Sequence, residues 1–80
     1  MPITIIGASY GATNAGADVT AIVQEMVNNG NDDILVTNQT MGGDPAPNIK
    51  KQFGIVYKLP NGDILARCAI EGQTIDLVTA

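Results

Sequence analysis

The segment Pro60-Asn61-Gly62-Asp63 separates two stretches of alternating apolar residues, and it constrains the fold more than any other feature of the chain. The alternating residues are Phe53, Ile55, Tyr57 and Leu59 before it, and Ile64, Ala66, Cys68 and Ile70 after it. Alternation is typical of a strand with one buried face, and Asn-Gly favours a two-residue turn with positive φ. The sequence therefore predicts an antiparallel hairpin in which Leu59 lies opposite Ile64 and both sets, Cys68 included, are buried.

The rest of the chain predicts three more strands and a helix. We expect strands at residues 3–10, 33–37 and 74–79, with Ile3, Ile5 and Ala8 inward, and loops at 11–17 and 38–51, which are rich in Gly or Pro. Apolar residues recur with helical spacing over 18–29, where Asp18 or Thr20 can cap the start and Gly30 suits the end. The predicted fold is mainly β, a small antiparallel β-sandwich or partly open barrel of about five strands with one short helix.

The length and composition predict one domain, residues 1–80, that gains stability from a second copy. Domains this small usually add a disulfide, a metal or a partner subunit to their core. The chain has one Cys and no His, so an internal disulfide is excluded and zinc lacks a favoured ligand. Charged residues make up 15% of the chain, which leaves little repulsion between copies. We therefore expect a homo-oligomer.

The charge and hydropathy patterns argue against two classes of partner. The net charge is −4 with four basic residues, and only Lys50 and Lys51 adjoin, so a phosphate-binding surface for nucleic acid is not expected. No apolar run reaches the length of a membrane span, and we see no signal peptide. The default expectation is a cytoplasmic protein.

The residue inventory predicts a protein that is not an enzyme and that uses no cofactor. The chain has no His, and Ser9 and Cys68 are its single Ser and Cys, so neither a Ser-His-Asp nor a Cys-His catalytic arrangement can be assembled. The cluster Asn28, Asn29, Asn31, Asp32 and Asp33 does not fit the calcium-loop spacing. We interpret it as a solvated turn, with a calcium site as the open alternative.

Two functions of different class fit this inventory. The first is a structural or interaction module that self-associates, either through the strands at 3–8 or 74–79 or through the second face of the hairpin. The candidate interface residues are Val56, Leu65, Arg67 and Ala69. The alternative is a small carbohydrate-binding protein, because amides and carboxylates suit sugar hydroxyls. Its candidate ligand residues are Tyr10, Asn38, Asp44 and Asn48.

Several phrases along the chain also occur, in the same order, in one known domain. They are Ala8-Ser9-Tyr10-Gly11, Asp18-Val19-Thr20, Gly43-Asp44-Pro45-Ala46-Pro47-Asn48, Lys51-Gln52-Phe53-Gly54-Ile55-Val56-Tyr57 and Glu71-Gly72. In these phrases the chain resembles the functionally uncharacterised domain found C-terminal in some mitochondrial J-domain co-chaperones. The resemblance implies a β-rich module of unknown activity. It covers no part of a J domain, so it implies neither co-chaperone activity nor a mitochondrial location.

Overall fold

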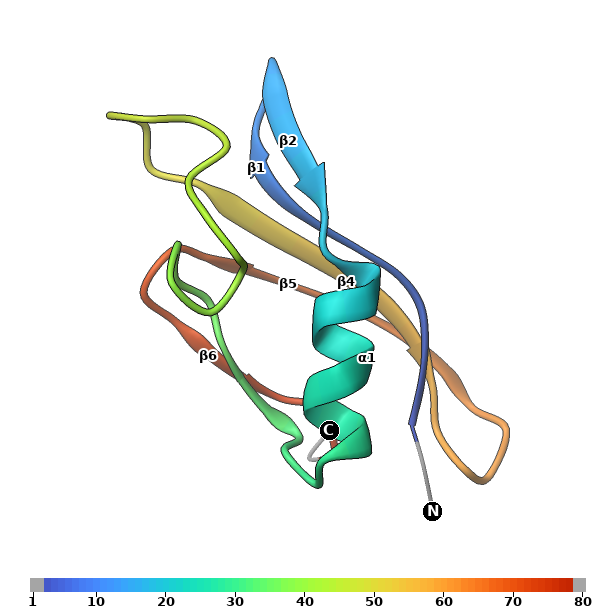
Figure 1. Ribbon diagram of the computed structural model, residues 1–80. Helices are drawn as coiled ribbons and strands as arrows, with labels where there is room; N and C mark the ends of the chain where they lie inside the picture. Colours follow the sequence, from blue (N-terminus) through green and yellow to red (C-terminus); the bar gives the residue numbers. More distant parts are fainter. Residues whose placement is uncertain (1–2, 79–80) are drawn as a thin grey trace.

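The computed structural model describes residues 3–78 and is mainly β, as predicted (Figure 1). Its elements are β1 (Thr4–Ala12), β2 (Ala15–Asp18), α1 (Thr20–Asn28), β3 (Asp33–Leu35), β4 (Gln52–Lys58), β5 (Ile64–Ile70) and β6 (Thr74–Asp76). One antiparallel sheet has the strand order β2-β1-β4-β5, and a separate two-stranded sheet pairs β3 with β6. In the part of the chain that the structure describes, the larger sheet does not close into a barrel.

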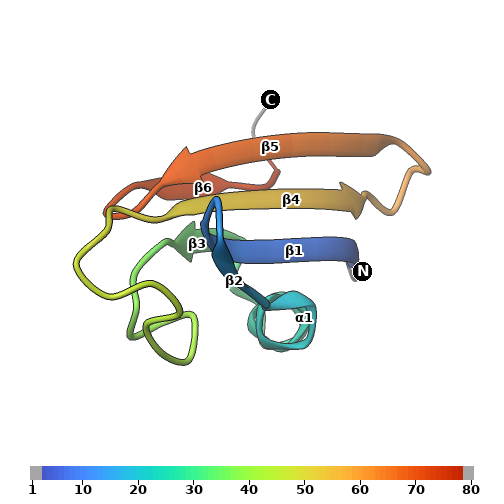
Figure 2. The same ribbon diagram turned by 90° about the horizontal axis from the view of Figure 1, so that it is seen from above.

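The core lies on one side of the four-stranded sheet, between that sheet and a second layer made of α1 and the β3–β6 pair (Figures 1 and 2). The inward residues of β4 are those that alternation predicted, Phe53, Ile55 and Tyr57. In β1 the register shifts between Ile5 and Gly7. This bulge moves the buried phase from Ile3 and Ile5 to Ala8 and Tyr10, the other core residues of this segment.

The helix forms close to the predicted place, and its ends explain its length. Val19 occupies the N-cap position, while the Asp18 carboxylate accepts the Thr20 N–H at 3.0 Å. At the other end, Gly30 has a φ of 89° and donates to Val27 O, and the next residue, Asn31, donates to Met26 O. These two bonds form a Schellman motif, in which Gly is favoured because it adopts positive φ without strain. No helix among residues 3–78 is long and apolar enough to cross a membrane.

The predicted register of the β4–β5 hairpin is wrong by one residue. The loop has three residues, Pro60 to Gly62, because Leu59 N–H donates to Asp63 O at 2.9 Å and closes it. Gly62 has a φ of 98°, as the last residue of a three-residue hairpin loop requires. An odd loop length reverses which residues share a face. Tyr57 therefore lies opposite Leu65, and it is the other set of β5 residues that faces the core side.

This change corrects the placement of Cys68 and its neighbours in β5. Cys68, expected to be buried, is exposed. The other members of the alternating set, Ile64, Ala66 and Ile70, are exposed with it on the outer face of the sheet. The residues that turn toward the core side are Leu65, Arg67 and Ala69, of which Ala69 is buried and the other two are partly exposed.

Two further expectations about strands are corrected. The segment at 11–17 is not a loop, because β1 continues to Ala12 and pairs with β2 around the two-residue turn Thr13-Asn14. The strand at 3–8 was expected to be a free edge. Instead, β4 pairs with one side of β1, and α1 borders the other side, where Gln24 accepts from Ile5 N–H and donates to Ile3 O. Residues 74–76 pair with β3, and residues 79–80 lie outside the described part.

Candidate functional site

Three of the four predicted ligand residues line one open cavity at the end of the four-stranded sheet. Asn38, Asp44 and Asn48 border it, and its volume is about 520 Å³. The fourth residue, Tyr10, reaches the site through its hydroxyl, which donates to Asn38 Oδ1. Its ring is buried, and burial, followed by the negative charge of Glu71, raises the pKa of this tyrosine. Tyr10 therefore positions the Asn38 side chain through this hydrogen bond, and its buried ring is not accessible to a ligand.

The sequence interpretation missed Lys51, which organises this loop. Its side chain is buried, and its Nζ lies 2.9 Å from Asp44 Oδ1 and 3.6 Å from Glu71 Oε1. Nζ also donates to two backbone carbonyls of the same loop, Ala46 O at 2.9 Å and Ile49 O at 2.7 Å. An ammonium has three protons to donate, so these contacts satisfy it. Lys51 fastens the loop at 38–51 to the sheet.

The charges in this cluster stabilise each other. The hydrogen bond from Lys51 is the main reason why the pKa of the Asp44 carboxyl is lowered. The same bond is the main reason why the pKa of Lys51 is raised. The lysine is therefore protonated at neutral pH and is not poised to act as a nucleophile or base. Its place in the fold is that of a structural cation.

Acid should weaken the ion pair between Lys51 and Asp44. A carboxyl whose pKa is lowered by folding stabilises the native state above its unfolded pKa, and this contribution is lost as pH falls through the folded pKa. We expect the stability difference between the wild type and Asp44→Asn to be constant above about pH 5 and to shrink below the ordinary aspartate pKa of about 3.9. Urea unfolding of both proteins from pH 7 to pH 2.5 measures this. A difference independent of pH would contradict the assignment.

All three aromatic rings of the chain are buried, which bears on the carbohydrate alternative. Tyr10, Phe53 and Tyr57 are each at most 1% exposed. Sugar sites commonly place the C–H groups of the sugar against the face of an aromatic ring, which supplies apolar contact. The lining of the cavity consists of amides, carboxylates and the Lys50 ammonium, with Ile49 as its apolar member. The cavity could therefore bind sugar hydroxyls, but it offers no aromatic ring for stacking.

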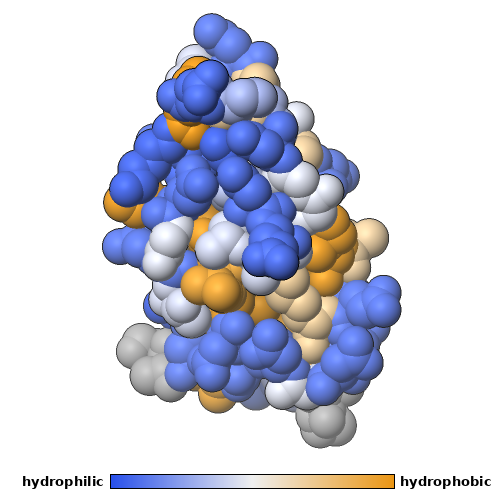
Figure 3. All heavy atoms as spheres, turned by 60° about the vertical axis from the view of Figure 1, so that its left-hand side comes forward, coloured by the Kyte–Doolittle hydropathy of each residue, from blue (hydrophilic) through white to orange (hydrophobic). Residues whose placement is uncertain are grey.

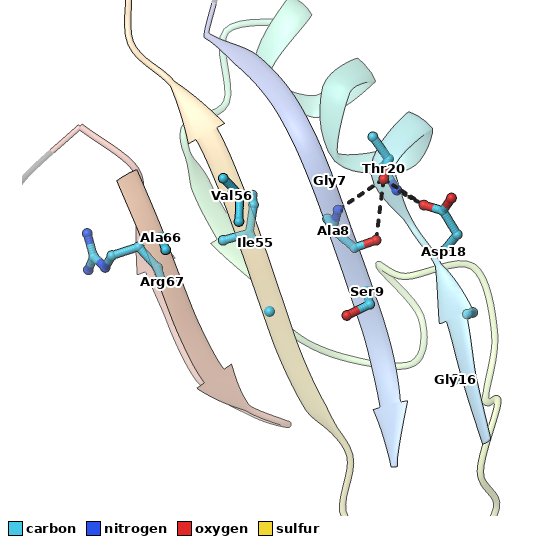
Figure 4. Close-up of a pocket in the computed structure, with 12 residues that line it drawn as sticks. Gly7, Ala8, Ser9, Gly16, Asp18, Thr20, Ile55, Val56, Ala66 and Arg67 are labelled. Carbon is cyan, nitrogen blue, oxygen red and sulfur yellow. Dashed lines mark hydrogen bonds between the residues drawn. The ribbon is translucent and has the colours of Figure 1, made fainter. Parts of the chain in front are cut away.

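The four candidate interface residues do not share a face. Val56 lies on the outer face of the four-stranded sheet, opposite Ala66, whereas Leu65, Arg67 and Ala69 turn to the core side. Arg67 donates to Asp76 O, which ties β5 to β6. The outer face carries a shallow hollow of about 670 Å³ that Gly7, Ser9, Gly16 and Gly54 help to line, together with Val56 (Figure 4). The hollow lies where the side chains of this face are small.

At the edge of this hollow, Asp18 and Thr20 hold the start of α1 against β1. Thr20 Oγ1 accepts from Ala8 N–H at 3.0 Å and donates to Asp18 Oδ1 at 2.6 Å, as Figure 4 shows. The hydrogen bond from the Thr20 hydroxyl is the main reason why the pKa of the Asp18 carboxyl is lowered, and the bond from Thr20 N–H adds to it. Both side chains are thus engaged in the fold.

The acidic cluster predicted at residues 28–33 is only partly assembled. Asp32 and Asp33 come together with Asp76, with carboxylate oxygens of all three within 4.8 Å of one another. Asp33 and Asp76 are opposite each other in the β3–β6 pair. The Asn31 side chain accepts from Asp33 N–H, and Asn28 accepts from Gln24. These amides therefore serve the turn and the helix end.

Comparison of the chain with protein-family models, with curated proteins and with solved structures finds no match. The resemblance to the C-terminal domain of J-domain co-chaperones therefore stays a prediction.

Proposed function

We propose that this protein is a non-catalytic structural module that associates with further copies of itself through its four-stranded sheet, either at an edge strand or on its outer face. The observation that carries the proposal is the one-sided cover of this sheet. The helix and the β3–β6 pair bury its inner face, while the outer face keeps Val56, Ile64 and Ile70 at 39%, 62% and 44% exposure. These three residues belong to the two adjacent strands β4 and β5.

The chemistry of this face supports a protein partner over a small ligand. In β5 this face has Ile64 and Ile70 at the two ends of the strand, with Ala66 and Cys68 between them. In β4 it has Val56, and Lys58 is the charged residue that these two strands place on it. Apolar area of this kind can be buried against a second copy. Burial of apolar area contributes about 25 cal/mol per Å². On the side of the molecule that Figure 3 shows, the left-hand side of Figure 1, hydrophobic residues also lie in patches between hydrophilic ones.

The oligomeric state in solution tests the proposal. We expect light scattering to give a mass above the 8.3 kDa of one chain at high concentration, and to fall toward it over a hundredfold dilution. The melting temperature should fall with dilution as well, because association stabilises the folded state by mass action. A mass of one chain throughout, with an unchanged melting temperature, would contradict the proposal.

The convergence of Asn38, Asp44 and Asn48 on one cavity favours saccharide binding as the second candidate function. We expect such binding to be lost in Asn48→Gly, while the fold is retained, because this residue is exposed and Gly adopts its φ of 66° without strain. A glycan array followed by calorimetry checks this. The candidate is excluded if no saccharide binds with a dissociation constant below about 1 mM, which corresponds to about −4 kcal/mol.

A further inference from the structure

Sheets expose unpaired backbone groups at their edges, and the edge of this sheet on the side of β1 and β2 is protected. On the side of β1 that does not pair with β4, the Gln24 side chain forms hydrogen bonds with Ile5 N–H and Ile3 O, and the Thr20 hydroxyl accepts from Ala8 N–H. The outermost strand beyond it, β2, has four residues and ends at Asp18. Short strands and charged side chains are the devices by which proteins prevent pairing at an edge.

The opposite edge, β5, carries fewer of these devices. It has seven residues, Ile64–Ile70, without Pro or Gly, and its pairing with β4 is free of bulges. Its single charged residue, Arg67, points to the core side and donates to Asp76 O. A long, flat and apolar edge of this kind is a template for another strand.

The hydrogen bonds at both ends of the hairpin determine which backbone groups of β5 point outward. Leu59 N–H donates to Asp63 O, and Glu71 N–H donates to Lys51 O. Since bonded pairs alternate along an antiparallel ladder, residues 65, 67 and 69 bond β4, and residues 64, 66, 68 and 70 face away from it. At Ile70, Gln73 occupies both groups, through its Oε1 and its N–H. The outward groups available for pairing are therefore those of Ile64, Ala66 and Cys68.

We infer that β5 pairs antiparallel with β5 of a second copy, about a two-fold axis at Ala66. This inference rests on the proposed self-association and specifies its geometry. Ala66 then lies opposite Ala66 of the second copy, and Ile64 lies opposite Cys68 on both sides of the axis. All three outward residues form bonded pairs, and two four-stranded sheets join into one of eight strands.

The occupant is a second copy because this edge is complementary to itself in that register. The apolar side chains of Ile64 and Cys68 meet on the outer face, and Leu65 lies opposite Arg67 of the second copy on the inner face. No like charges are opposed. Moving the two-fold axis from Ala66 to Arg67 would place Arg67 against Arg67, which is unfavourable, and would require the groups of Ile70 that Gln73 already binds. Moving the axis to Leu65 would place Cys68 opposite Gly62, in the hairpin loop.

Proline at position 66 tests pairing at the edge. Ala66→Pro removes an outward N–H, so the bonds between β5 and β4 remain, and proline is tolerated at such edge positions. We expect the dissociation constant of the dimer to rise at least about tenfold, while the circular dichroism of the fold persists. The matched variant Val56→Asp changes the outer face in the adjacent strand, away from the edge, and should weaken the dimer less than Ala66→Pro.

Each outcome of this pair has a separate meaning. If the wild type is monomeric, both the proposed function and the inference fail. If the wild type associates, Ala66→Pro associates equally well and Val56→Asp does not, the proposed function stands and the edge pairing is overturned. The sheets would then pack face to face.

Cysteine cross-linking tests the register and does not depend on the proline variant folding. In the inferred register Cys68 faces residue 64 of the second copy, at the spacing of about 5.5 Å between Cα atoms of a bonded pair, which a disulfide can bridge. We expect Ile64→Cys to give a covalent dimer on mild oxidation. Neither the wild type nor Ile70→Cys, which places the new thiol on the same face of β5, should do so. The register would be overturned if the wild type or Ile70→Cys gave a covalent dimer, or if Ile64→Cys gave none.

Discussion

Replacing Tyr57 by alanine is expected to lower the free energy of unfolding by about 3–5 kcal/mol, the usual cost of truncating a buried aromatic residue. The side chain is fully buried in β4, and its hydroxyl donates to Leu77 O at 2.8 Å. It thus joins the four-stranded sheet to the segment that follows β6. A domain of 80 residues has a total stability of roughly 4–12 kcal/mol. Urea unfolding followed by circular dichroism should show a protein close to the limit of folding.

The variant Tyr57→Phe is the matched control, because it removes the hydroxyl and keeps the ring. It leaves the buried Leu77 carbonyl without its partner, which we expect to cost about 1–3 kcal/mol. If phenylalanine cost as much as alanine, the hydrogen bond to Leu77 would outweigh the packing of the ring. If alanine cost less than about 2 kcal/mol, the packing of β4 on the second layer would be weaker than the structure indicates.

The sequence was informative where two independent signals agreed. In β4, alternation and residue size both favour burial of Phe53, Ile55 and Tyr57, and these residues are buried. In α1, helical spacing and Gly30 together predict the element and its end. Regular strands and helices at the predicted positions therefore follow from local patterns.

The face of β5 could not be predicted in the same way, because both of its faces carry apolar residues. Ile64, Ala66, Cys68 and Ile70 form one set, and Leu65 and Ala69 belong to the other. The loop decides between them. Asn61-Gly62 suits a two-residue turn, but Pro60 as its first residue and Gly62 with positive φ also suit a three-residue loop. The three-residue loop puts the more apolar set outside, where the proposed interface lies.

The candidate ligand cavity was predicted in part. The side-chain chemistry of Asn38, Asp44 and Asn48 and their place in a stiff loop point to ligand binding, and the fold brings them to one cavity. Lys51 was missed, because a lysine is not expected in a buried position. A signal existed nonetheless. Lys51 continues the alternation of Phe53 and Ile55 backward by one step, which places it in the buried phase of the strand.

Replacing Lys51 by methionine is therefore expected to destabilise the protein strongly, although the length of the side chain is kept. The substitution leaves Asp44 and the carbonyls of Ala46 and Ile49 without the cation that joins them. Of these groups the Ala46 carbonyl is buried, and a buried polar group that loses its partner is costly. We expect the melting temperature to fall on the order of 10 °C, a large shift for a domain of this size. Amide hydrogen exchange should accelerate first in residues 38–50.

The neighbouring Lys50→Met is the control, because Lys50 carries the same charge and borders the same cavity but is exposed. Its substitution should change the melting temperature by no more than about 4 °C, as expected for a surface residue whose effect stays within about 0.5 kcal/mol. Equal effects of the two substitutions would mean that Lys51 acts through net charge and not through its bonds. A loop that exchanged at the wild-type rate in Lys51→Met would show that the prolines alone hold it in place.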